Sequence, residues 1–181
     1  MEMTFDEIRQ SIENQLQKLE DDTDLTSASD FRMAQRWGSI NTRLGLIIVL
    51  VSGIITTTGV YASVGDFQDM QRYFTLSVTV LASIATVVGS VLTFLKPSER
   101  GEQYREFGNK QKALRNRIRI YRSVLMKQEP SVERPSEQLV AFGQEKDALN
   151  SANPPIPRSA FRTASKDMLE KRRRRAKLNG V

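Results

Sequence analysis

The sequence predicts an all-α membrane protein, with a hairpin of two transmembrane helices and a cytoplasmic helical bundle that assembles into oligomers. Its apolar residues are concentrated in two blocks, 44–62 and 74–95, and neither block contains Lys, Arg, Asp or Glu. At about 1.5 Å per residue, each block is long enough as a helix to cross a hydrocarbon core of about 30 Å. The segments on either side of the pair are strongly polar, which favours helices that lie outside the membrane.

The composition excludes most catalytic and metal-binding sites. The chain has no Cys and no His, so disulfides, thiolate nucleophiles, imidazole bases and Cys/His zinc sites are ruled out. It also lacks a Gly-rich phosphate loop and paired carboxylates at a useful spacing. We therefore expect no enzyme activity, no cofactor and no bound metal ion.

Residues 1–43 are predicted to form cytoplasmic helices. Thr4 and Glu7 fit a capping box that begins one helix, and Ser27 and Asp30 fit a second box. The acidic stretch 20–24 lies between the two boxes and is expected to break the chain into two helices, with the second running on into the first span.

The two blocks give a topology with both termini in the cytoplasm. Transmembrane helix 1 is predicted over 44–62, an extracytoplasmic loop over 63–73 and transmembrane helix 2 over 74–95. Lys and Arg residues gather just before the first span and just after the second, whereas the loop has only Arg72, beside two Asp residues. Because cytoplasmic flanks retain Lys and Arg, we expect a multi-pass protein of the inner (plasma) membrane.

Small hydroxyl residues follow one face of each span. In the second span they recur at spacings of three and four, at Thr75, Thr79, Ser83, Thr86, Ser90 and Thr93; the first span has a looser counterpart that includes Ser52 and Thr56. One interpretation is close helix packing, for which membrane proteins often use such residues. The other is that one stripe lines a water-filled path in an oligomer, because one hairpin cannot enclose a pore.

Residues 96–157 are predicted to form cytoplasmic helices followed by a Pro-rich connector. Pro97 should end the second transmembrane helix at Lys96, because a residue before proline avoids helical geometry. The following helix has an apolar seam at Tyr104, Phe107, Leu114, Ile118, Tyr121 and Leu125, with Gln111 as the one polar member. This heptad spacing fits either an oligomer contact or packing against the chain's own N-terminal helices.

Residues 158–181 are predicted to form a basic helix or tail. The basic run consists of Lys171, Arg172, Arg173, Arg174, Arg175 and Lys177. In a membrane protein such a run favours contact with anionic lipid; the alternatives are the acidic N-terminus or no specific partner. Nucleic acid is the weakest candidate partner, because no aromatic residues interleave the run.

Three short stretches resemble the SLATT family, the SMODS and SLOG-associating two-transmembrane effector domains. They are Asp30–Trp37 before the first span, Phe94–Arg100 at the end of the second, and Asn153–Pro157 in the connector. The resemblance covers roughly 25–165. It implies a membrane effector of a bacterial antiphage defence system, triggered by a nucleotide signal or a sensor.

By that resemblance, the protein would oligomerise into a pore that permeabilises the inner membrane and halts the infected cell. The chain has no sensor or nucleotidyltransferase domain of its own, so the trigger would come from a cytoplasmic partner. The alternative function is a non-conducting membrane anchor or scaffold that recruits a cytoplasmic partner.

Overall fold

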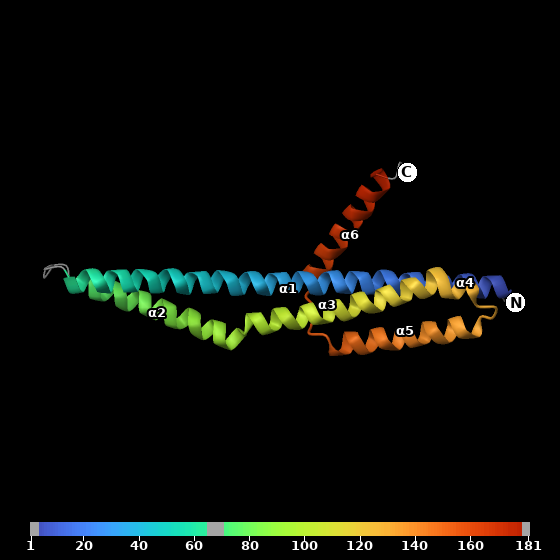
Figure 1. The fold of residues 1–181 in the computed structure, drawn as a ribbon, viewed down its shortest axis with the longest axis horizontal. Helices are drawn as coiled ribbons and strands as arrows, with labels where there is room; N and C mark the ends of the chain where they lie inside the picture. The colour runs from blue at the N-terminus through green and yellow to red at the C-terminus, as the bar shows by residue number, and fades with distance from the viewer. Residues whose placement is uncertain (1–3, 65–70, 179–181) are drawn as a thin grey trace. The chain divides into compact units, whose positions relative to one another are not determined.

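The computed structural model describes residues 4–64 and 71–178, and in these ranges all regular secondary structure is helical. The elements are α1 (Phe5–Val64), α2 (Gln71–Leu95), α3 (Pro97–Ile120), the π-helical turn η1 (Tyr121–Leu125), α4 (Met126–Gln128), α5 (Glu133–Ala152) and α6 (Arg158–Leu178) (Figure 1). The all-α prediction is confirmed. Of the predicted loop 63–73, positions 65–70 lie outside the described residues.

The chain divides into two compact units. The first, which we call the bundle unit, comprises Met1–Ala34 and Glu102–Val181; the second, the hairpin unit, comprises Gln35–Gly101. The bundle unit therefore combines the first half of α1 with most of α3 and all of α5 and α6. The hairpin unit contains the second half of α1, the whole of α2 and the first turn of α3.

The predicted break between two N-terminal helices is wrong, because α1 continues through 20–24 without interruption. Bases on other helices neutralise its acids. Ion pairs join Glu20 to Arg122 at 3.1 Å, Asp22 to Lys146 at 3.0 Å, and Asp24 to Arg115 at 3.0 Å. These tertiary contacts remove the like-charge repulsion that would otherwise open the helix.

The two predicted capping boxes have different outcomes. At the first, the backbone N–H of Thr4 donates to the Glu7 carboxylate at 2.8 Å, and the N–H of Glu7 donates back to the Thr4 hydroxyl at 3.4 Å. The second box is wrong, because Ser27 and Asp30 lie inside α1 and turn their side chains to other segments of the chain.

The core of the bundle unit joins α1, α3, η1, α4 and α5. Its buried side chains are Ile12, Leu16, Leu114, Ile118, Tyr121, Met126 and Phe142. The rings of Tyr121 and Phe142 meet edge to face, with centroids 5.8 Å apart, which is a favoured aromatic geometry. Ile12 and Leu16, four positions apart on α1, are thus buried within the chain.

In the hairpin unit, α2 runs back along the second half of α1 (Figure 1). Both α1 and α2 contain an apolar stretch long enough to cross a membrane, and no residue of either stretch is buried. A core helix of a water-soluble domain would be covered, so these exposed apolar helices are suited to lipid.

The end of α2 matches the prediction from the Lys-Pro pair. Lys96 has a φ of 44°, in the left-handed region, and α3 begins at Pro97. Proline suits the first position of a helix because it has no N–H to leave unsatisfied. The membrane helix therefore stops at Leu95 and a new helix starts two residues later.

Candidate functional site

The two helices of the hairpin pack through half-buried residues at spacings of three and four. On α1 these include Leu44, Ile48, Val51, Ile55 and Thr58, and on α2 Phe74, Val78, Leu81, Ala85, Gly89, Leu92 and Leu95. This is the spacing of an antiparallel helix pair with one continuous seam. The seam is almost entirely apolar, so van der Waals packing joins the helices.

The hydroxyl stripe lies outside this seam. All six of its members on α2, with Ser52 and Thr56 on α1, are exposed in the chain. Hydroxyls on both helices donate to the carbonyl four residues earlier, at 2.8 or 2.9 Å, as at Thr56, Thr79, Ser83, Thr86, Ser90 and Thr93. The stripe therefore takes no part in packing within one hairpin, and both interpretations from the sequence now concern further copies.

The two stripes lie on the same side of the hairpin. Ser52 and Thr56 each follow a seam residue of α1 by one position, and most stripe residues of α2 do the same. One position is a rotation of about 100°. Both helices are right-handed, but their axes run in opposite directions. A step of one position from the seam therefore brings both stripes to the same side of the plane through the two axes. The hairpin thus has one hydroxyl-bearing side.

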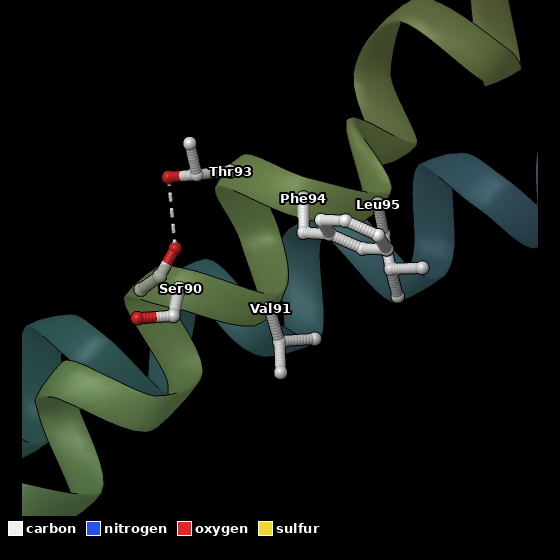
Figure 2. Close-up of a pocket in the computed structure, with 6 residues that line it drawn as sticks. Ser90, Val91, Thr93, Phe94 and Leu95 are labelled. Atoms are coloured by element: carbon white, nitrogen blue, oxygen red, sulfur yellow. Dashed lines mark hydrogen bonds between the residues drawn. The ribbon is translucent and has the colours of Figure 1, made fainter.

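A shallow depression lies at the C-terminal end of α2. It is lined by Gly89, Ser90, Val91, Thr93, Phe94 and Leu95. Figure 2 shows the Thr93 hydroxyl and the Phe94 ring on different sides of the helix, so polar and apolar sides meet here. The Phe94 side chain is 86% exposed, as expected for a ring that contacts lipid or another protein.

A cation–π contact lies near this end of the hairpin unit. The guanidinium of Arg100, on the first turn of α3, lies 5.1 Å from the centroid of the Trp37 ring on α1. Pro97 beside it is buried. The contact joins α3 to α1 just beyond the apolar span, where Trp and Arg suit a membrane boundary.

The predicted seam on α3 is used within the chain. Tyr104, Leu114, Ile118 and Tyr121 are buried, with at most 7% of each exposed, and Phe107 is half-buried. Gln111 is fully buried among them. Of the two partners that the sequence left open, the structure shows the chain's own helices, so these side chains leave little surface for an oligomer contact.

Leu125 is the exception, because it is not buried with the other seam residues. It is 47% exposed, whereas Met126 is 2% exposed and occupies the core. The cause is the π-helical turn η1, which begins at Tyr121. A π turn closes its hydrogen bond over five residues instead of four. The seam residue that follows Tyr121 is therefore Met126, five positions later, and not Leu125.

Sequence reasoning missed a buried polar cluster in the bundle unit. The Asn153 amide nitrogen donates to both carboxylate oxygens of Asp30, at 2.9 and 3.1 Å, and the Gln111 amide donates to Asn150 at 2.9 Å. The hydroxyl of Tyr104 donates to the carbonyl of Pro155 at 2.9 Å. These bonds tie α1, α3 and α5 to the connector.

Asp30 is fully buried, and its hydrogen-bond donor is a neutral amide. Burial raises the pKa of its carboxyl to about 6, and the hydrogen bond from Asn153 opposes that rise only in part. A pocket of about 200 Å³ adjoins the cluster, lined by Thr26, Asn150, Asn153, Pro154, Pro155, Ile156 and Phe161. The sequence signal was that Asp30 and Asn153 stand in two of the three stretches that carry the family resemblance.

The basic run lies on α6. Lys171, Arg173, Arg174 and Lys177 are exposed, and Arg174 pairs with Glu170 at 2.6 Å; the side chains of Arg172 and Arg175 lie outside the described residues. The acids of the N-terminal segment that pair with Arg122, Lys146 and Arg115 are already neutralised by α3, η1 and α5. An ion pair between Arg32 and Asp167 links α1 to α6.

Comparison with known protein families identifies a relationship. A fungal SLATT family model, described as the SMODS and SLOG-associating 2TM effector domain, matches residues 26–146. The match spans both apolar helices and about half of the bundle unit. No curated protein and no solved structure matches the chain.

Proposed function

Because the chain belongs to the family of SMODS and SLOG-associating 2TM effector domains, we propose that it is a pore-forming membrane effector of a defence system. The family and the two long apolar helices make it a membrane protein with a two-transmembrane effector domain. Pore formation by several copies is the step that we add. The matching model is the fungal one, so the proposal does not depend on the bacterial setting that the resemblance implied.

The observation that carries this proposal is the exposed hydroxyl-bearing side of the hairpin. Thr86 and Ser90 lie outside the hairpin seam, yet both are within an apolar span. Their hydroxyls donate to the helix backbone, which leaves the oxygen lone pairs free to accept hydrogen bonds from water or to contact a cation. Several hairpins with this side inward would enclose a polar path.

The chemistry of the spans suggests how such a path would behave. The two apolar blocks contain no Lys, Arg, Asp or Glu, so the lumen would have no charged ring and weak ion selectivity. Apolar residues between the hydroxyls would disfavour water in the closed state. A trigger from a cytoplasmic sensor or a nucleotidyltransferase-linked partner would then rotate the helices enough to wet the path.

The distribution of Lys and Arg supports both termini in the cytoplasm and a plasma-membrane location. The exposed bases of α6 support a further contact, with anionic lipid headgroups. This contact is tested by tryptic cleavage at Lys171 and Arg173 in nanodiscs. We expect slower cleavage in anionic than in neutral lipid, and we expect this difference to disappear at high salt. Equal cleavage rates in both lipids would contradict the contact.

The pore is tested by dye and ion leakage from liposomes that contain the full chain. Thr56 and Thr57 provide a matched pair, because both are exposed threonines that donate to the carbonyl four residues earlier at 2.9 Å. Thr56 lies on the hydroxyl-bearing side, whereas Thr57 is one position, about 100°, further round. We expect Thr56→Val to reduce leakage several-fold and Thr57→Val to leave it unchanged. Equal effects of the two variants would contradict the lumen assignment.

A scaffold without conduction is the second candidate, favoured by one observation. Ile120, Val124 and Leu125 are 55%, 48% and 47% exposed on α3 and η1, which is a surface that a cytoplasmic partner could cover. The scaffold predicts no leakage under any trigger and loss of partner recruitment in Leu125→Asp. Leakage that survives this substitution would favour the pore.

A further inference from the structure

The polar cluster contains a buried acid without a compensating cation. Charged residues of the neighbouring helices are paired with one another instead. Arg32 pairs with Asp167 of α6, and Arg115 of α3 with Asp24; on α5, Lys146 pairs with Asp22 and Glu145 with Arg117. In the part of the chain that the structure describes, the side chain of Asp30 is thus hydrogen-bonded to the neutral amide of Asn153 and to no cation.

The amide of Asn153 also has an unused acceptor. Its Oδ1 atom is buried and receives no hydrogen bond in the described structure, while its nitrogen is shared between both oxygens of Asp30. A buried carbonyl without a donor costs free energy. A carboxylic acid would supply that donor, because a neutral Asp has one O–H group.

We infer that Asp30 and Asn153 form a proton-dependent latch that holds the connector 153–157 against α1. When Asp30 takes up a proton, the shared amide donor is replaced by two hydrogen bonds between the acid and the amide, one in each direction. The proton comes from solvent and binds a carboxylate oxygen of Asp30. The O–H so formed donates to Oδ1 of Asn153, and the amide nitrogen donates to the other oxygen. Both polar groups are then satisfied.

The raised pKa of Asp30, about 6, agrees with this geometry, because the cluster favours the neutral acid. The connector has a second attachment at the Tyr104–Pro155 hydrogen bond, so loss of the latch loosens the connector without freeing it. Asn153 ends α5, and α6 begins five residues later. Acidification therefore tightens the attachment of α6, and a rise in pH loosens it. The latch lies in the bundle unit and does not depend on the proposed pore.

The latch is tested by spin-label distances in the full chain in nanodiscs. The absence of native Cys allows labels at Asn14→Cys on α1 and Ser159→Cys on α6, both exposed sites. We expect one narrow distance distribution near pH 5 and a second, longer population that grows with a half-change near pH 6. The equilibrium constant for closing the latch should differ by up to about a hundredfold between neutral and ionised Asp30, the equivalent of about two pKa units.

Three substitutions decide between the latch and a general charge effect. Asp30→Asn mimics the neutral acid and should give the narrow distribution at every pH, whereas Asn153→Ala should give the broad one at every pH. Asp22→Asn removes a different carboxylate of α1, one that pairs with Lys146, and should keep the transition near pH 6. A distribution that does not change with pH, a transition that survives in Asp30→Asn, or one that is lost in Asp22→Asn would overturn the inference.

Discussion

The hydroxyl of Ser27 on α1 donates a 2.9 Å hydrogen bond to the carbonyl oxygen of Gly108 on α3. The two helices are close here, because a Cβ added to Gly108 would lie 3.2 Å from the Phe31 ring and 3.3 Å from the Cβ of Asp30. Both neighbours are held in the bundle, so neither can yield freely.

Gly108→Ala should therefore destabilise the bundle unit by about 1–3 kcal/mol, the usual cost of overpacking. Gly143→Ala is the matched control, since a Cβ there meets nothing within 4 Å and should add about 0.5–1 kcal/mol of helix stability. Thermal unfolding in detergent, followed by circular dichroism, measures both. A neutral or stabilising Gly108→Ala would show that the helices are further apart than described.

The register change at η1 predicts unequal costs for adjacent residues. Met126→Ala should cost about 2–5 kcal/mol because Met126 is in the core. Leu125→Ala should change stability by no more than about 0.5 kcal/mol, because Leu125 is on the surface. The same unfolding measurement compares them. A larger loss of stability for Leu125→Ala than for Met126→Ala would support a regular heptad and contradict the π turn.

Asp30 predicts a pH dependence of stability with a defined sign. Its pKa is about 6 in the fold against an ordinary value of 3.8, so the fold binds more protons than the unfolded chain between these values. The stability contributed by neutral Asp30 is full below pH 3.8 and is lost as the pH rises through 6. The difference of about two pKa units, at about 1.4 kcal/mol each, gives about 3 kcal/mol.

Asp30→Asn should accordingly raise the free energy of unfolding near pH 8 by about 2–3 kcal/mol, and should have almost no effect near pH 4. Urea unfolding in detergent at both pH values provides the comparison. If Asp30→Asn destabilised the protein equally at both, the carboxylate would be serving as a needed acceptor, and the raised pKa would be contradicted.

Trp37 is the single Trp of the chain, so its fluorescence reports on the contact with Arg100. Arg100→Ala uncovers one face of the ring, and we expect emission at longer wavelength and a loss of about 0.5–1 kcal/mol. Arg36→Ala is the control, because Arg36 is exposed beside Trp37 on the same helix. An unchanged emission in Arg100→Ala would show that the stacking does not persist in lipid.

Much of the fold could be predicted from the sequence, because lipid imposes a strong and local requirement on composition. The absence of charge from 44–62 and 74–95 and the Lys96–Pro97 pair were enough to place both apolar helices and the end of the second. The seam on α3 was also visible up to Tyr121 from its spacing.

The remaining features depend on contacts between distant residues. The acids of 20–24 look like a helix break until Arg122, Lys146 and Arg115 are placed opposite them. Asp30 looks like an N-cap until Asn153 is brought to it from more than a hundred positions away. No local pattern in the sequence predicts η1. The regular heptad spacing therefore points to Leu125, whereas the structure buries Met126.

The most direct test of the central claim is the mass of the full chain in lipid nanodiscs, measured by native mass spectrometry. A hydroxyl-bearing side that lines a lumen needs several hairpins, so we expect a defined homo-oligomer in the presence of the activating partner. A protein that remains a single chain under every triggering condition would contradict the pore.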